Sequence, residues 1–102
     1  MTDESFGPVL GVMPVDSDAE ALAYMNDSPY GLTAAIFTAS HERAVELTPQ
    51  IEAGTVFMNR CDYLDPHLAW TGVKDTGCGV SLSRFGFGSY YRLKSWHHKL
   101  VL

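Results

Sequence analysis

The sequence predicts an α/β fold: a three-layer, open and mostly parallel sheet with helices on its faces, followed by a C-terminal strand. Strand-like and helix-like segments alternate over about fifty residues, which is the arrangement of right-handed βαβ units. Apolar residues make up 46% of the chain and charged residues 19%, as in ordinary globular proteins. Because 102 residues fit one compact unit, we expect a single domain over residues 1–102.

The first strand and the first helix are predicted between residues 9 and 26. The apolar run from Val9 to Val15 indicates a strand, with a proline near each end. Ser17 and Glu20 have the spacing of a capping box, so a helix should begin near Ser17. Turn-forming residues at 26–29 then end this helix early.

A second helix is predicted between two further strands. Residues 32–38 indicate a buried strand, because apolar side chains occupy both of its faces. Ser40 is the candidate N-cap of the helix, and Gly54 stands where a C′ glycine is expected. Pro49 removes a backbone donor, so we expect a kink or a frayed last turn there. Residues 55–59 form the third predicted strand.

The last third of the chain is less regular. Residues 60–79 have no hydrophobic period, and an irregular loop of that length is usually functional. Ser81 or Ser83 is the candidate cap of a last helix that runs through Tyr91. Alternating polar and apolar residues predict a final strand at about 93–102.

Composition and charge exclude several classes of function. The formal net charge of −5 and the absence of a Lys/Arg cluster argue against a nucleic-acid partner. No apolar stretch approaches the ~20 residues of a membrane span, and the first residues do not resemble a signal peptide, so we expect a cytoplasmic protein without a membrane partner. Cys61 and Cys78 lack the spacing of a disulfide scaffold or a zinc site, and the adjacent His97 and His98 would point to opposite faces of a strand. No metal is expected.

Four motifs follow one another along nearly the whole chain. Their sequences are Glu-Ser-Phe-Gly-Pro-Val from Glu4, Tyr-Gly-Leu-Thr-Ala from Tyr30, Gly-Thr-Val-Phe-Met-Asn from Gly54, and Gly-Val-Lys-Asp-Thr-Gly from Gly72, with Gly79 beyond. Together, in this order and at these intervals, they resemble the aldehyde dehydrogenase superfamily. The resemblance implies the C-terminal half of the catalytic domain of an NAD(P)-dependent enzyme that oxidises an aldehyde to a carboxylic acid.

The resemblance also implies two cofactor-binding residues. Glu4 matches the glutamate that holds the ribose hydroxyls on the nicotinamide side of NAD or NADP, and Phe6 matches the phenylalanine that packs beside the nicotinamide ring. A carboxylate suits this role, because it can accept hydrogen bonds from both vicinal hydroxyls.

Substrate contacts are implied for the loop that follows Asn59. Leu64 and Trp70 match positions that line the aldehyde funnel in the family, and Tyr63 is a weaker candidate. Large apolar side chains suit the burial of an organic tail. The chain departs from the family pattern around Trp70, where Ala-Trp-Thr-Gly replaces Pro-Phe-Gly-Gly, and at 80–81, where Val-Ser replaces Arg-Glu. The substrate range of relatives is therefore not transferable.

The resemblance places both catalytic residues of the family, a cysteine nucleophile and a glutamate, before the motif that begins at Glu4. We therefore expect a fragment that is inactive alone and contains no catalytic residue. A reactive cysteine needs a nearby cation, base or helix N-terminus. Cys61 and Cys78 are expected to be structural.

A second hypothesis is a stand-alone module that has lost catalysis and serves assembly. An unpaired apolar strand edge favours association between chains. We therefore expect self-association through the C-terminal strand at about 93–102.

Overall fold

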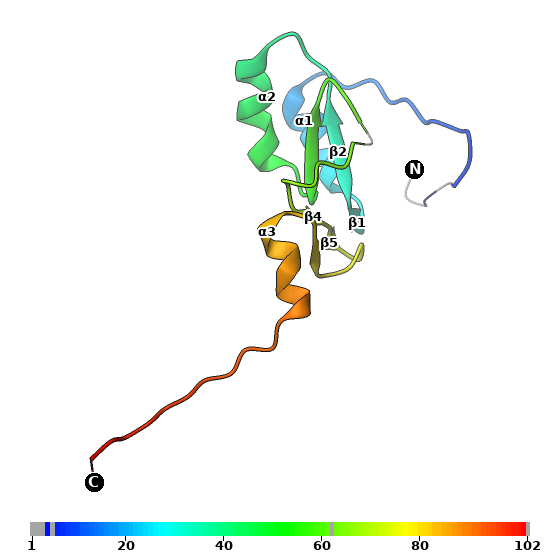
Figure 1. The fold of residues 1–102 in the computed structure, drawn as a ribbon. Coiled ribbons are helices and arrows are strands. Elements are labelled where there is room, and N and C mark those ends of the chain that lie inside the picture. Colours follow the sequence, from blue (N-terminus) through cyan, green and yellow to red (C-terminus); the bar gives the residue numbers. More distant parts are fainter. Residues whose placement is uncertain (1–3, 5, 62, 102) are drawn as a thin grey trace.

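The computed structural model describes Glu4, residues 6–61 and residues 63–101 (Figure 1). Its elements are, in chain order, helix α1 (Asp18–Asn26), strands β1 (Tyr30–Gly31) and β2 (Thr33–Ile36), helix α2 (His41–Leu47), the 3₁₀ turn η1 (Thr48–Gln50), strands β3 (Thr55–Met58), β4 (Trp70–Thr71), β5 (Val73–Lys74) and β6 (Val80–Ser81), helix α3 (Ser83–Gly86) and the 3₁₀ turn η2 (Phe87–Tyr90).

A parallel strand pair forms the centre of the fold. β2 and β3 pair in register from Thr33 opposite Thr55 to Ile36 opposite Met58, and α2 connects them. This βαβ unit confirms the predicted parallel pairing of the second and third strands. The side-chain amide of Asn59 closes the far end of the pair, because it accepts a hydrogen bond from the backbone N–H of Thr38 and donates one to the carbonyl of Thr38, both at 2.8 Å.

The other strand pairs are short and antiparallel. β1 pairs with β5, and β4 pairs with β6. The described residues therefore contain three separate two-stranded sheets, one of them parallel. The α/β class is confirmed, whereas the three-layer, mostly parallel sheet is not formed by these residues alone.

Helix α1 begins where its capping residues predict. The hydroxyl of Ser17 accepts a hydrogen bond from the backbone N–H of Glu20 at 3.2 Å, and the Glu20 carboxylate accepts one from the N–H of Asp16 at 2.9 Å. These bonds satisfy donors that a helix N-terminus leaves without intrahelical partners.

Helix α2 also begins at its predicted cap and ends early. The Ser40 hydroxyl accepts a hydrogen bond from the N–H of Arg43 at 3.1 Å. After Leu47 the α-helix gives way to η1, which contains Pro49. The predicted fraying at the proline is confirmed. The prediction that Gly54 is the C′ residue is wrong, because the helical turns end at Gln50 and Gly54 directly precedes β3.

Charged side chains connect the two helices. The Arg43 guanidinium of α2 forms ion pairs with Glu46 of the same helix and with Asp18 at the start of α1. Hydrogen bonds to Glu46 and Asp18 raise the pKa of Arg43 above its usual value. All three side chains are exposed, so these ion pairs contribute little to stability.

Two sequence-based predictions are corrected in the irregular regions. Residues 9–15 are exposed and form no strand, because they find no partner among the described residues and Pro14 lacks a backbone donor. The predicted irregular loop at 60–79 contains β4 and β5. The predicted last helix is present but short, since η2 replaces its second half.

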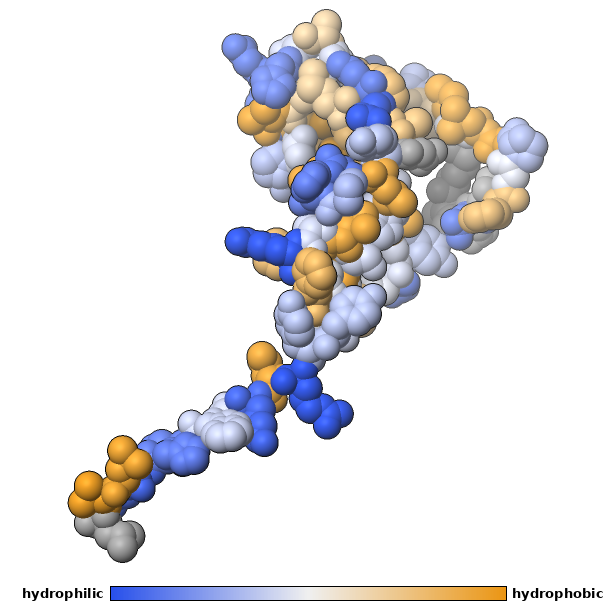
Figure 2. Space-filling view, viewed as in Figure 1, coloured by the Kyte–Doolittle hydropathy of each residue, from blue (hydrophilic) through white to orange (hydrophobic). Residues whose placement is uncertain are grey.

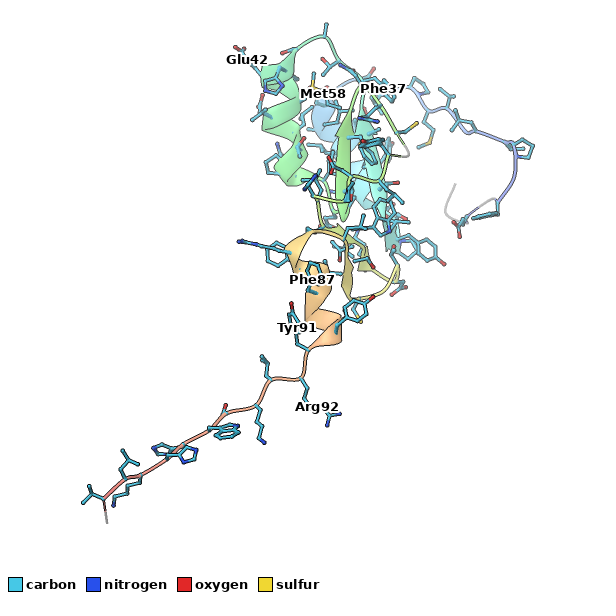
Figure 3. All side chains as sticks on the ribbon, in the orientation of Figure 1. Phe37, Glu42, Met58, Phe87, Tyr91 and Arg92 are labelled. Atoms are coloured by element: carbon cyan, nitrogen blue, oxygen red, sulfur yellow. The ribbon has the colours of Figure 1, made fainter. Side chains whose placement is uncertain are left out.

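The C-terminal segment leaves the body as an extended arm. Figure 3 labels Tyr91 and Arg92 where the arm begins. Residues 91–101 form no strand with the rest of the described chain, so the predicted C-terminal strand is absent here, and Leu102 lies outside the described residues. Leu93 and Leu100 are 96% and 95% exposed.

Apolar surface is left uncovered over much of the chain. Ala44 and Ile51 are the buried hydrophobic residues of the described part. The accessible surface of 8903 Å² exceeds the ~5,700 Å² expected of a globular monomer of this mass. The radius of gyration is 19.1 Å, against ~13 Å for a compact domain of this length. Figure 2 shows apolar residues at the surface of the body and at the end of the C-terminal arm.

A polar cluster, which we call the hub, connects three distant segments. It consists of Asn26, Glu52 and Lys74. The Asn26 amide donates to the carbonyl of Gln50 at 2.8 Å and accepts from the N–H of Glu52 at 2.9 Å. The Lys74 ammonium donates to the carbonyls of Asn26 and Ser28 and pairs with the Glu52 carboxylate at 2.7 Å. The hub therefore holds three segments together: the end of α1, the residues just before β3, and strand β5.

Replacing Asn26 tests the hub. The substitution Asn26→Ala removes two side-chain hydrogen bonds to backbone groups, so we expect the free energy of unfolding to fall by about 1–3 kcal/mol. Urea denaturation followed by circular dichroism measures this. The exposed neighbour Asp27 provides the matched control, and Asp27→Asn should leave the urea midpoint nearly unchanged. Equal midpoints for the two variants would contradict the assigned role.

Candidate functional site

One cavity of about 140 Å³ lies between β3 and the segment that follows it. Its lining is mainly apolar and aromatic, with a few polar groups. The lining residues are Thr55, Phe57, Arg60, Tyr63, Asp65, Leu68, Ala69, Trp70 and Leu82. A concave apolar site with a few polar groups is the usual form of a small-molecule site.

Strand β3 supplies the floor of the cavity. Thr55 and Phe57 are two residues apart, so they point to the same face of the strand. Met58 points to the opposite face, toward α2, where it borders a shallow hollow with Ala44 (Figure 3). The Thr55 hydroxyl oxygen is buried and finds no hydrogen-bond partner among the described residues.

A close backbone approach places Trp70 at the cavity. A Cβ on Gly54 would collide with the carbonyl oxygen of Thr71, so only glycine allows β4 to lie this close to the start of β3. β4 is also paired with β6, where Trp70 is opposite Ser81. These contacts fix the backbone position of Trp70, which lines the cavity together with Thr55.

The charged lining residues come from the segment after β3. The Arg60 guanidinium lies over the ring of Tyr63, 3.8 Å from its centroid. This is a cation–π contact at close range. Asp65 accepts a hydrogen bond from the backbone N–H of His67 at 2.9 Å, so its carboxylate is already engaged by a turn.

The last wall of the cavity is a strained residue. Leu82 has a φ of 60° and Ser83 a φ of 49°, in the region that favours glycine. The N–H of Ser83 donates to the carbonyl of Pro66 at 2.9 Å, and the N–H of Gly86 donates to the carbonyl of Leu82. These bonds hold Leu82 against the segment that carries Asp65.

The predicted site residues are only partly brought together. Trp70 and Tyr63 line the cavity, whereas Leu64 is exposed and lies outside its lining. Glu4 and Phe6 lie on the N-terminal segment, which runs away from the helices and strands (Figure 1). Phe6 is fully exposed. The proposed roles of Glu4, Phe6, Leu64 and Trp70 stay predictions.

Sequence reasoning missed Thr55, Phe57 and Arg60. The alternation of side chains along residues 55–59 was the available signal, because it places Thr55 and Phe57 on one face. Nothing local indicated that residues 60–70 cover that face.

The cysteines do not form part of this cavity. Cys61 and Cys78 are exposed thiols. Cys78 borders a separate open hollow, which also contacts Leu32 and Trp70. Within the described ranges no group of three metal-ligating side chains occurs. In those same ranges, no helix has the length and apolar character needed to cross a membrane.

The chain belongs to the aldehyde dehydrogenase family, whose model matches residues 1–96. A probable betaine aldehyde dehydrogenase of Schizosaccharomyces pombe is 39% identical over 92 residues, which are 90% of this chain and 18% of that protein. Among solved structures, the P. syringae indole-3-acetaldehyde dehydrogenase AldA, in complex with NAD⁺ and IAA, is 39% identical with a TM-score of 0.85, covering 91% of this chain and 19% of that one.

An NAD-dependent aldehyde dehydrogenase of Sinorhizobium meliloti is 33% identical with a TM-score of 0.86, over 91% of this chain and 18% of that one. The chain thus spans about a fifth of the length of the relatives it matches. Its open conformation resembles a segment of these larger proteins.

Replacing Gly54 tests the geometry of the cavity. The substitution Gly54→Ala forces β4 away from β3, so we expect a loss of about 1–3 kcal/mol of stability and a shift of the Trp70 fluorescence maximum. Measurement in a Trp96→Phe background isolates the signal of Trp70. Gly88→Ala is the control, because a Cβ there meets open space. An unchanged Trp70 spectrum in a folded Gly54→Ala variant would contradict this geometry.

Proposed function

We propose that this chain is the C-terminal half of the catalytic domain of an enzyme that oxidises an aldehyde to a carboxylic acid with NAD(P)⁺. The observation that supports this most directly is the cavity beside β3, which combines an apolar lining with a few polar groups in a member of the aldehyde dehydrogenase family. In this proposal Trp70 buries the organic part of the aldehyde, and Leu64 lies nearer the entrance.

The cofactor residues proposed for this chain are Glu4 and Phe6. A carboxylate at Glu4 can accept hydrogen bonds from the two ribose hydroxyls of NAD or NADP. The fully exposed ring of Phe6 is available to pack beside the nicotinamide. The bound dinucleotide supplies the acceptor for the hydride. The residues of this chain orient it and exclude water.

We also propose that the nucleophile and the general base come from polypeptide outside these 102 residues. Within the described ranges, neither cysteine sulfur has a hydrogen-bond partner that could activate it as a thiolate, and both thiols are exposed. The large uncovered apolar surface supports a fit against further structure, because a stable domain buries most of such surface. The three-layer sheet would then be completed by additional strands.

Two assays with NAD⁺ test the proposal. The isolated chain should give no NADH with aldehyde substrates. A chimera in which it replaces the matching segment of the P. syringae AldA enzyme should oxidise aldehydes, because the rest of that enzyme supplies what this chain lacks. The double variant Cys61→Ala, Cys78→Ala of the chimera should remain active. Turnover by the isolated chain, abolished by alkylating either cysteine, would overturn the proposal, as would a folded chimera without activity.

A second candidate function is assembly through the C-terminal arm. Leu93, Trp96 and Leu100 are strongly exposed on an extended backbone that has no strand partner within the described residues. An extended segment with unpaired backbone groups can add to the edge of a sheet in another subunit. We propose that residues 93–102 contribute to self-association, with or without catalysis.

Deleting residues 93–102 tests this role. We expect the full chain to sediment as a dimer or larger species at high concentration and the truncated chain to sediment as a monomer, because the truncated chain loses the apolar arm. Analytical ultracentrifugation over a concentration series measures this. The variant Lys94→Gln, which keeps the apolar side chains, is the control. A full chain that stays monomeric would contradict self-association.

A further inference from the structure

We infer that the cavity selects aldehydes that carry a carboxylate, and that Arg60 is the specificity-determining residue that binds this group. This inference rests on the proposed function, because it names the substrate class of the same site. The position of Arg60 and the apolar, aromatic lining support it by separate observations.

The size and lining of the cavity define the body of the ligand. An apolar cavity of ~150 Å³ in a protein core can hold a benzene ring, and this cavity measures about 140 Å³. Phe57, Leu68 and Trp70 provide apolar contacts around such a ring. The ligand body is therefore a single ring or a short branched chain.

The position of Arg60 defines the charge of the ligand. Its guanidinium plane lies over Tyr63 at 3.8 Å, so the face of the group is covered and the N–H donors at its edge are left for a partner. A carboxylate accepts two parallel hydrogen bonds from such an edge. No acidic side chain among the described residues forms an ion pair with Arg60.

The other polar lining groups are compatible with an anionic ligand. Asp65 is the acidic residue of the lining, and its carboxylate accepts the hydrogen bond from His67. This bond offsets part of its repulsion of an anion. At the floor, Thr55 lines the cavity, and its hydroxyl oxygen is itself buried.

Binding to the full chain tests the inference without turnover. We would use a Trp96→Phe background, so that Trp70 gives the sole indole N–H signal in NMR spectra. The probes are 4-acetylbenzoate and the neutral acetophenone, ketones chosen because they react less readily with lysines than aldehydes do. We expect the carboxylate probe to shift the Trp70 signal and to bind about 10-fold more tightly than the neutral probe.

Three variants assign the effect. Arg60→Gln should remove the difference between the probes, and Arg60→Lys should restore part of it. Arg92→Gln should leave the difference intact, because Arg92 lies on the C-terminal arm, away from the cavity (Figure 3). Equal affinities for the two probes would overturn the inference. So would an unchanged preference in Arg60→Gln, or no shift of Trp70 with either probe.

The outcomes separate this inference from the proposed function. An active chimera that oxidises benzaldehyde and 4-formylbenzoate equally well retains the function and overturns the selectivity. A folded but inactive chimera, together with Arg60-dependent binding of 4-acetylbenzoate, overturns the function and retains Arg60 as a carboxylate-binding residue.

Discussion

The hub of Asn26, Glu52 and Lys74 is the constraint on which the rest of the structure depends. It joins positions 26, 52 and 74 through hydrogen bonds to backbone groups and one partly shielded ion pair. Because few apolar side chains are buried, polar contacts of this kind determine how α1, β3 and β5 meet. Gly54 follows two residues after Glu52, so the hub also fixes the point where β3 passes β4. The cavity forms beside that crossing.

Local signals in the sequence predicted the elements that need no distant partner. Ser17 and Ser40 cap α1 and α2 as expected, and Pro49 ends α2, because each acts through backbone groups within four residues. The strand expected at 9–15 failed for the opposite reason, since a strand requires a neighbour to pair with. β4 and β5 were missed because two-residue pairings between distant segments leave no periodic pattern.

The candidate site shows the same division. Trp70 was identified through motifs shared with the family, and the structure places it in the cavity. Thr55 and Arg60 line the cavity because the segment after β3 folds back across the strand. The identity of these two residues does not predict this chain path. The role expected of Gly54 was wrong for a related reason: glycine favours helix ends, but here the requirement is a close contact with Thr71.

The backbone of Leu82 limits how the cavity can change over evolution. A non-glycine residue with positive φ costs free energy, and branching at Cβ increases that cost. The β-branched residues valine and isoleucine are therefore poor replacements, although they are close to leucine in size and polarity. Leu82 has φ 60° and ψ 179°, a region adopted almost only by glycine, and glycine would enlarge the space. Relatives with a different ligand size should accordingly vary at Leu68 or Phe57 before they vary at Leu82.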